Sequence, residues 1–266
     1  MADLEYSRAD AVATILLNRP ERKNAFTLQM VRHWADALHE AAKDDQVRVV
    51  VVRGAGGAFC SGIDLDELTS VDPAPLSRRR MLTDEVHRVA RALEDLDKPV
   101  IAAVQGTAVG AGLDMALMCD IRLVSESARL SEGYIHAGLI PGDGGCLWLP
   151  RLVGVGRALE LLLTGDVVDG PRAERIGLAN HCYPDGELLT RTYELAARLA
   201  ALPPVAVGFI KRATYESLHL DVRTHLNMIA SHMAVVQSTE DSAATLAALR
   251  AKRKTGVKRS EPKLPE

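Results

Sequence analysis

The fold of this chain is constrained most by one segment, residues 99–120, which reads PVIAAVQGTAVGAGLDMALMCD. Residues 100–104 predict a buried strand, residues 106–112 allow tight turns, and residues 113–118 predict the first turns of a helix that carries Asp114. Backbone N–H groups at a helix start point outward without partners and favour negative charge. An acid beside such unpaired N–H groups indicates proton transfer next to a carbonyl group.

The composition is that of an ordinary globular protein. Of the 266 residues, 47% are hydrophobic and 25% are charged, and the formal net charge is −3. This length suffices for a large core with a smaller appended module. The slightly acidic balance argues against nucleic acid as a partner.

The sequence also indicates a cytoplasmic location. The first ten residues carry acids where a signal peptide would carry a basic start, and polar residues and glycines break residues 99–120 too often for a membrane helix. We therefore expect neither export nor a membrane partner. Wide spacing indicates free thiols rather than a metal site or disulfides for the four cysteines, Cys60, Cys119, Cys146 and Cys182.

The pattern along the chain predicts an α/β fold. Residues 12–17 and 47–52 read as buried strands, with a helix between them that Thr27 can cap. Strand, helix, strand implies a parallel pair, and residues 100–104 and 120–124 supply further strands. From about residue 141 helices dominate, at residues 156–164, 171–176, 187–200, 204–218, 221–236 and 239–252.

Two glycine-rich loops follow predicted strands. Residues 53–64 and 106–112 both leave the carboxyl edge of the predicted sheet, where ligands collect. Each loop can donate one backbone N–H to a single oxygen, as in an oxyanion hole. The plainer alternative is that the glycines only turn the chain. Neither loop completes a GxGxxG or GxxxxGK nucleotide motif.

A third loop, residues 131–145, is dense in polar groups. It holds Glu132, Tyr134, His136 and Asp143. Spacing alone favours Asp143 as the cap of a helix at residues 145–152. His136, and His87 in a predicted helix at residues 76–96, are by type more typical of surface or satisfied core positions than of catalytic ones.

Five segments in order resemble the signatures of the crotonase superfamily, the enoyl-CoA hydratase and isomerase family. They are NRPERKNAF, GAFCSGIDL, KPVIAAVQGTAVGAGLDMALMCDIRL, GLIPGDGGCLWLPRLVG and RALELLLTGDVVDGPRAERIGLAN. The resemblance covers roughly residues 1–255. It implies a spiral of ββα units over residues 1–200 and a helical region over residues 201–255 that builds a trimer or a dimer of trimers. Residues 256–266 are then a frayed tail.

The resemblance also implies an acyl-CoA substrate and no cofactor beyond the coenzyme A that the substrate carries. The thioester oxygen would be held by the backbone N–H groups of Ile63 and Ala111. The positions implied in coenzyme A binding are Arg22, Asp64, Leu65 and, from a neighbouring subunit, Lys252 or Arg253.

The catalytic acids depart from the hydratase pattern. Hydratases of the family use two glutamates, which fall here on Asp114 and Tyr134. A phenol is a poor base at neutral pH, so two-glutamate hydration is not supported. Glu132 would replace the missing acid only if the loop shifted. Branches resembling acyl-CoA dehalogenases and C–C bond hydrolases place a catalytic aspartate near Asp143, which makes Asp143 a site residue.

We therefore expect an enzyme that acts through a thioester enolate, either an enoyl-CoA isomerase or a non-standard hydratase. One alternative is a hydrolase that uses Asp143, with His87 and Tyr134 assisting, on an acyl-CoA or a β-diketone; His87 coincides with the dehalogenase branch's histidine. A second alternative is an RNA-binding relative, suggested by basic residues at 78–80 and 252–259. The net charge and the lack of interleaved aromatic residues argue against RNA.

Overall fold

The computed structural model describes residues 2–254 and, of these, the side chains of residues 2–251. The chain divides into two compact units, the first ending at Ala201 and the second beginning at Leu202. The predicted tail, residues 256–266, lies outside the described residues.

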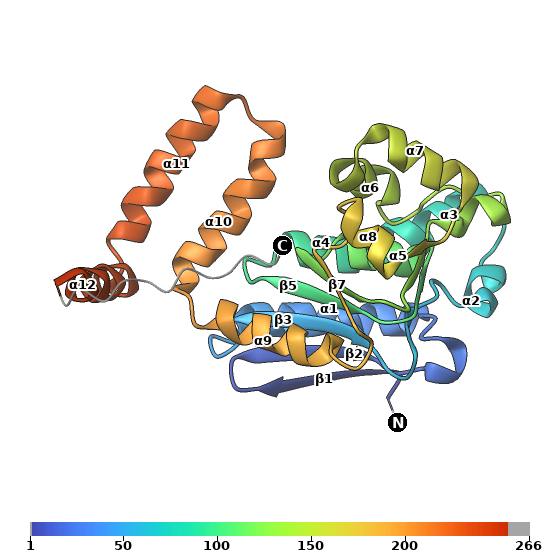
Figure 1. Cartoon of the computed structure of the whole chain (residues 1–266). Coiled ribbons are helices and arrows are strands. Elements are labelled where there is room, and N and C mark those ends of the chain that lie inside the picture. The colour runs from blue at the N-terminus through green and yellow to red at the C-terminus, as the bar shows by residue number, and fades with distance from the viewer. Residues whose placement is uncertain (1, 255–266) are drawn as a thin grey trace. The chain divides into compact units, whose positions relative to one another are not determined.

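A six-stranded sheet forms the centre of the first unit (Figure 1). Its order is β1-β2-β3-β5-β7-β10, antiparallel between β1 and β2 and parallel elsewhere. Parallel neighbours need crossover connections, which helices supply here. The strands are β1 (Leu4–Ala9), β2 (Val12–Leu17), β3 (Val49–Gly54), β5 (Val100–Val104), β7 (Ile121–Ser125) and β10 (His181–Tyr183).

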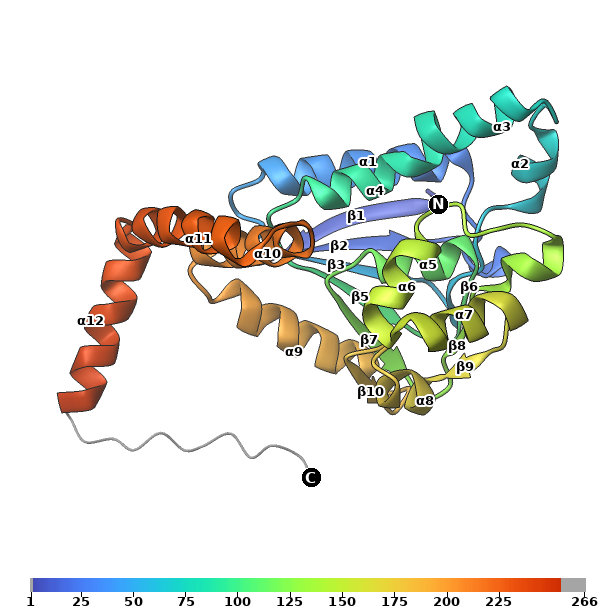
Figure 2. The same cartoon turned by 90° about the horizontal axis from the view of Figure 1, so that it is seen from above.

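Helices cover both faces of this sheet. Figure 2 shows α1 (Leu28–Lys43) and α4 (His87–Glu94) on one side and α9 (Leu188–Ala200) on the other. Side chains alternate across a strand, so Val50 and Val52 of β3 join the core beneath α1, and Val49 and Val51 join a smaller cluster beneath α9. Burial on both faces explains the unbroken valine run. The Thr27 side chain caps α1 as predicted.

A second, smaller sheet has the order β4-β6-β8-β9. Its strands are β4 (Ala58–Cys60), β6 (Thr107–Val109), β8 (Arg129–Ser131) and β9 (Val168–Asp169), the last of which is antiparallel to β8. β4 follows β3, β6 follows β5, and β8 follows β7, so each of these turns of the chain adds one strand to each sheet. This repetition confirms the predicted spiral of strand pairs and helices.

The described part of the first unit contains six further α-helices. They are α2 (Leu65–Ser70), α3 (Pro75–Arg80), α5 (Ala111–Leu117), α6 (Gly145–Val153), α7 (Val155–Thr164) and α8 (Gly170–Arg175). The single helix predicted at residues 76–96 is wrong in one respect, because a π-helical segment at Met81–Val86 separates α3 from α4. The extra residue per turn in such a segment changes the face that the following residues present.

The second unit is helical. It contains α10 (Pro204–Glu216), α11 (Val222–Gln237) and α12 (Glu240–Lys254), and α11 packs against α10 and α12. α11 buries none of its residues and exposes Val222, Leu226, Met233 and Val235. Within residues 2–254 no single helix is long and apolar enough to cross a membrane, although α9 and the segment 204–219 together reach that length and composition.

Candidate active site

Two glycine-rich loops meet where β4 and β6 end. Phe26 donates its N–H to Gly62 O at 2.9 Å and accepts the N–H of Asp64 at 2.9 Å, which leaves the N–H of Ile63 on the other side of the backbone. A Cβ placed on Gly62 would lie 3.5 Å from the nitrogen of Ala111, the first residue of α5. Neither Ile63 nor Ala111 donates its N–H to another residue within 2–254. Two unpaired donors therefore lie on adjacent segments.

The glycines do more than turn the chain. A Cβ on Gly112 would lie 2.2 Å from Cys60 O, so only glycine lets α5 approach β4 this closely. Gly110 has a φ angle of +53°, a backbone conformation that residues with a Cβ atom rarely adopt. The ring of Tyr134 lies directly against it, 3.7 Å from where a Cβ would be. Both positions fix the backbone on which the Ala111 N–H depends.

Asp114 lies in the first turn of α5 and is fully buried. Its Oδ2 accepts a 2.6 Å hydrogen bond from the Tyr134 hydroxyl and a 3.3 Å hydrogen bond from the backbone N–H of Asp143. Its Oδ1 is buried and accepts no hydrogen bond from the described residues. The acid that the sequence singled out is thus held at one oxygen by the two other predicted site residues.

Tyr134 joins the two aspartates. It lies on a 3₁₀ turn at Gly133–Ala137, and its hydroxyl also reaches Asp143 Oδ2 at 3.3 Å. One hydroxyl therefore contacts both carboxyl groups. Asp143 is buried and does not cap α6, whose N-cap is Gly144 with no side-chain hydrogen bond, so the capping role favoured by spacing is wrong.

His87 also belongs to this cluster. Its Nε2 lies 2.8 Å from Gly142 O and 3.9 Å from Asp143 Oδ1. It is the first residue of α4, immediately after the π-helical segment, and its side chain is about one-third exposed. The structure thus brings together all four predicted catalytic residues, although their roles depend on the reaction.

A fifth member is Glu132, which the sequence admitted to the site only if the loop shifted. It follows β8 and is buried with both carboxyl oxygens lacking a donor among the described residues. A Cβ placed on Gly145 would lie 2.5 Å from Asp114 Oδ1 and 2.9 and 3.0 Å from the two Glu132 oxygens. Glu132 therefore reaches Asp114 without any shift of the loop. The available signal was an acid directly after a buried strand.

Burial changes the proton affinities of the cluster. Desolvation raises the pKa of Asp114 to about 7 and that of Asp143 to about 6, where the nearby His87 moderates the rise. Desolvation, aided by the neighbouring aspartates, raises the pKa of Glu132 to about 9, and burial also raises the pKa of Tyr134. Proton donors and acceptors near neutrality are the groups that general acid–base catalysis uses.

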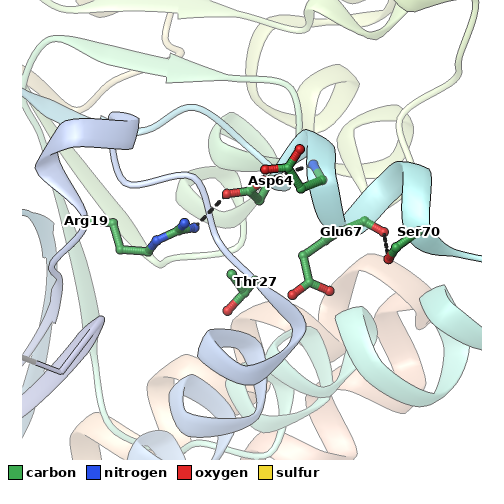
Figure 3. Close-up of a pocket in the computed structure, with 6 residues that line it drawn as sticks. Arg19, Thr27, Asp64, Glu67 and Ser70 are labelled. Carbon is green, nitrogen blue, oxygen red and sulfur yellow. Dashed lines mark hydrogen bonds and ion pairs between the residues drawn. The ribbon is translucent and has the colours of Figure 1, made fainter.

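Of the predicted coenzyme A residues, Asp64 lines a pocket of about 310 Å³, together with Arg19, Thr27, Asp66, Glu67 and Ser70. Figure 3 shows Arg19 reaching Asp64 across it, at 2.9 Å. Burial favours the neutral form of Asp64, but the Asp66 N–H and the Arg19 guanidinium outweigh it and lower the pKa of that carboxyl. Leu65 is exposed. Arg22 is exposed and forms a loose ion pair with Asp66, while the side chain of Lys252 is outside the described residues.

Comparison with known proteins agrees with this architecture. The family described as Enoyl-CoA hydratase/isomerase matches residues 7–259. The chain is 34% identical over 244 residues to a short-chain-enoyl-CoA hydratase of Clostridium acetobutylicum, covering 91% of this chain and 92% of the relative. It is 34% identical over 247 residues to a 1,2-epoxyphenylacetyl-CoA isomerase of Escherichia coli, covering 91% and 93%.

Solved structures show the same fold. An enoyl-CoA hydratase from Bacillus anthracis superposes with a TM-score of 0.89 at 32% identity, covering 94% of this chain and 97% of the other. Fold, sequence and the convergence of the two loops therefore lead to one conclusion: this chain is an enzyme of the enoyl-CoA hydratase/isomerase family, within the crotonase superfamily.

Proposed function

We propose that this enzyme moves a carbon–carbon double bond in an enoyl-CoA thioester by a 1,3-proton shift. The observation that carries the proposal is the Tyr134 hydroxyl, which contacts one carboxyl oxygen of Asp114 and one of Asp143. Two acids joined by one hydroxyl can take a proton at one carbon and return a proton at another. An isomerisation requires these two transfers and no water.

The unpaired N–H groups of Ile63 and Ala111 support the first step. Their segments are adjacent, and neither N–H donates a hydrogen bond to another residue within 2–254. Two such donors on a thioester oxygen stabilise the negative charge that develops when a proton leaves the neighbouring carbon, each by roughly 3 to 4 kcal/mol. The α proton of the substrate is thereby made acidic enough for a carboxylate to remove.

The proton path follows from the pKa values. Asp143, with a pKa of about 6, is mostly ionised at neutral pH and removes the α proton. The γ carbon takes a proton from the Tyr134 hydroxyl, and Asp114, with a pKa of about 7, returns one to the phenol. Asp143 then holds a proton that Asp114 lacks, and the hydroxyl between them carries it back.

Hydration fits this site less well. Adding water across a double bond requires a base that activates the water, in addition to the group that protonates carbon. The residue at the second glutamate position is Tyr134, whose pKa is raised further by burial, so it stays protonated at neutral pH and cannot act as the base that takes a proton from water. We propose isomerisation as the main reaction, and non-standard hydration is the related outcome that the assay distinguishes.

The proposal extends to binding and assembly. We propose that the pocket at Arg19 and Asp64 marks the side where coenzyme A lies. Arg22 pairs with Asp66 of its lining, and Leu65 directly follows Asp64 in the chain. We also propose a homo-oligomer, a trimer or a dimer of trimers, because α11 exposes apolar side chains that a second copy of the chain would cover.

A two-substrate assay tests the reaction. With a 3-enoyl-CoA we expect 2-enoyl-CoA as product, and we expect Asp143→Asn to lower kcat by about 10² to 10⁴, the usual contribution of a general base. Asp166→Asn makes the same change at an exposed aspartate and is the matched control. Hydration of 2-enoyl-CoA as the faster reaction, surviving Asp143→Asn, would refute the proposal.

Hydrolysis is the second candidate, favoured by the His87 and Asp143 pair. Oδ1 of Asp143 has no hydrogen-bond donor among the described residues and lies 3.9 Å from His87 Nε2, so it is available as a nucleophile. A single turnover in water labelled with heavy oxygen tests this. Label in the Asp143 side chain, or a covalent adduct there, would support nucleophilic attack, and the absence of both would exclude it.

A further inference from the structure

The third carboxyl group of the cluster, Glu132, has no assigned role. Glu132 is 1% exposed, and neither of its carboxyl oxygens accepts a hydrogen bond from the described residues. An ionised carboxylate without donors is very costly to bury, whereas a protonated carboxyl group can satisfy itself by donating to a neighbouring acceptor. The neighbourhood of Glu132 therefore indicates which form is present.

The neighbouring acceptor is Asp114. The position that a Cβ on Gly145 would occupy lies 2.5 Å from Asp114 Oδ1 and within 3.0 Å of both Glu132 oxygens, so the two carboxyl groups converge on one point. Oδ1 is the Asp114 oxygen that lacks a donor, since Oδ2 accepts from Tyr134 and from the Asp143 backbone. One proton between Glu132 and Oδ1 satisfies both groups.

Among the described residues, the charged groups that act on Glu132 are acidic. The titratable groups that act on it are Asp114 from α5 and Asp143 from the loop before α6, both of them acids. Cys146 of α6 feels its charge as well, and Tyr134 lies two residues along the chain. The basic group His87 lies by Asp143, with its Nε2 3.9 Å from Asp143 Oδ1. Burial and acidic neighbours all favour the neutral form of Glu132.

We propose that Glu132 is a positioning residue that stays protonated at neutral pH and donates a hydrogen bond to Oδ1 of Asp114. This bond fixes the Asp114 carboxyl group with Oδ2 toward Tyr134. It also offsets the negative charge that Asp114 gains when it gives up a proton. The inference rests on the proposed function only in that Asp114 transfers a proton, and it holds whether the product is an isomer or a hydrate.

The protonation state is measurable in the resting enzyme, without substrate. Carbon-13 labelling of glutamate carboxyl groups and an NMR titration would identify the Glu132 resonance as the one missing in Glu132→Gln. We expect this resonance to remain in the protonated position at pH 7. Titration near the ordinary value of 4.5 would overturn the inference, independently of which reaction the enzyme catalyses.

Kinetics test the effect on Asp114. Glu132→Leu removes the donor, so the ionised form of Asp114 loses a hydrogen bond and the alkaline limb of the pH–rate profile moves upward by about one to two pH units. We expect kcat to fall by about tenfold or more while KM changes little. Glu132→Gln keeps a donor and restores most of that loss. The matched controls are Glu126→Leu and Glu126→Gln, at an exposed glutamate.

Two kinetic results would overturn the inference. If Gln and Leu at position 132 behave alike, the hydrogen bond has no role. If Glu132→Gln moves the alkaline limb downward by more than about one unit, the substitution has removed a negative charge, and Glu132 is ionised in the wild type. Should Glu132→Leu fail to fold, the NMR titration of the wild type still decides.

Discussion

Replacing Tyr134 by Phe removes one oxygen atom and tests the hydrogen-bonded cluster directly. The ring that packs against Gly110 is kept, so the backbone beside Ala111 retains its support. What is lost is the 2.6 Å hydrogen bond to Asp114 and the 3.3 Å contact with Asp143. The substitution therefore separates the chemistry of the hydroxyl from the packing of the ring.

The magnitude follows from the charge of the acceptor. A hydrogen bond to a charged group contributes about 1.5 to 3 kcal/mol, and each pKa unit corresponds to about 1.4 kcal/mol. Losing the bond destabilises the ionised form of Asp114, so its pKa rises from about 7 by roughly one to two units. Asp114 then keeps its proton to higher pH, and the alkaline limb of the rate profile moves upward.

The rate itself should fall, because the hydroxyl also carries the proton to carbon. General acid catalysis contributes about 10² to 10⁴ in rate, so we expect a loss of kcat in that range. The assay is kcat and kcat/KM for a 3-enoyl-CoA across pH, with circular dichroism to verify folding. An alkaline limb that stays in place, with kcat within about twofold of wild type, would refute the reasoning.

Three further predictions use other parts of the site. The wild-type profile should be bell-shaped, rising through about pH 6 as Asp143 loses its proton and falling above about pH 7 as Asp114 loses its own, and a pH–rate measurement checks this. Gly145→Ala places a Cβ 2.5 Å from Asp114 Oδ1, so we expect a loss of activity and of about 1 to 3 kcal/mol in unfolding free energy, whereas Gly156→Ala, with nothing within 4 Å, should leave activity intact in the same assays. Asp64→Asn should be less stable than wild type at neutral pH, because the lowered pKa of Asp64 stabilises the folded protein above about pH 3.8, the ordinary pKa of an aspartate. Thermal melts should show this difference in stability closing as the pH falls through the pKa of Asp64 in the folded protein.

The regular elements were predictable because their signals are local. The valine run became β3, the glycine-rich segment became β6 and the start of α5, and Thr27 caps α1. The predicted starts and ends of most helices differ from the structure by one or two residues, since the last turn of a helix depends on what packs there. The π-helical segment at Met81–Val86 has no comparable pattern in the sequence.

The site was predictable only in part. The resemblance selected Asp114, Tyr134 and Asp143, and the structure brings them into contact. Spacing alone favoured Asp143 as a helix cap. In the structure its carboxyl group instead accepts a hydrogen bond from Tyr134, nine positions earlier, and spacing around a helix start does not reveal such a partner. Glu132 was expected to take part only after a loop shift, because its place beside Asp114 depends on the approach of Gly145 at the start of α6, a contact that no local pattern encodes.

The mass of the product formed from a 3-enoyl-CoA tests the central claim most directly. Isomerisation leaves the mass of the thioester unchanged, hydration adds one water, and hydrolysis releases free coenzyme A, so one mass spectrum of an early time point separates all three reactions. We predict a product of unchanged mass that absorbs as a conjugated 2-enoyl thioester. A product one water heavier, or free coenzyme A, formed faster than the isomer would contradict the account.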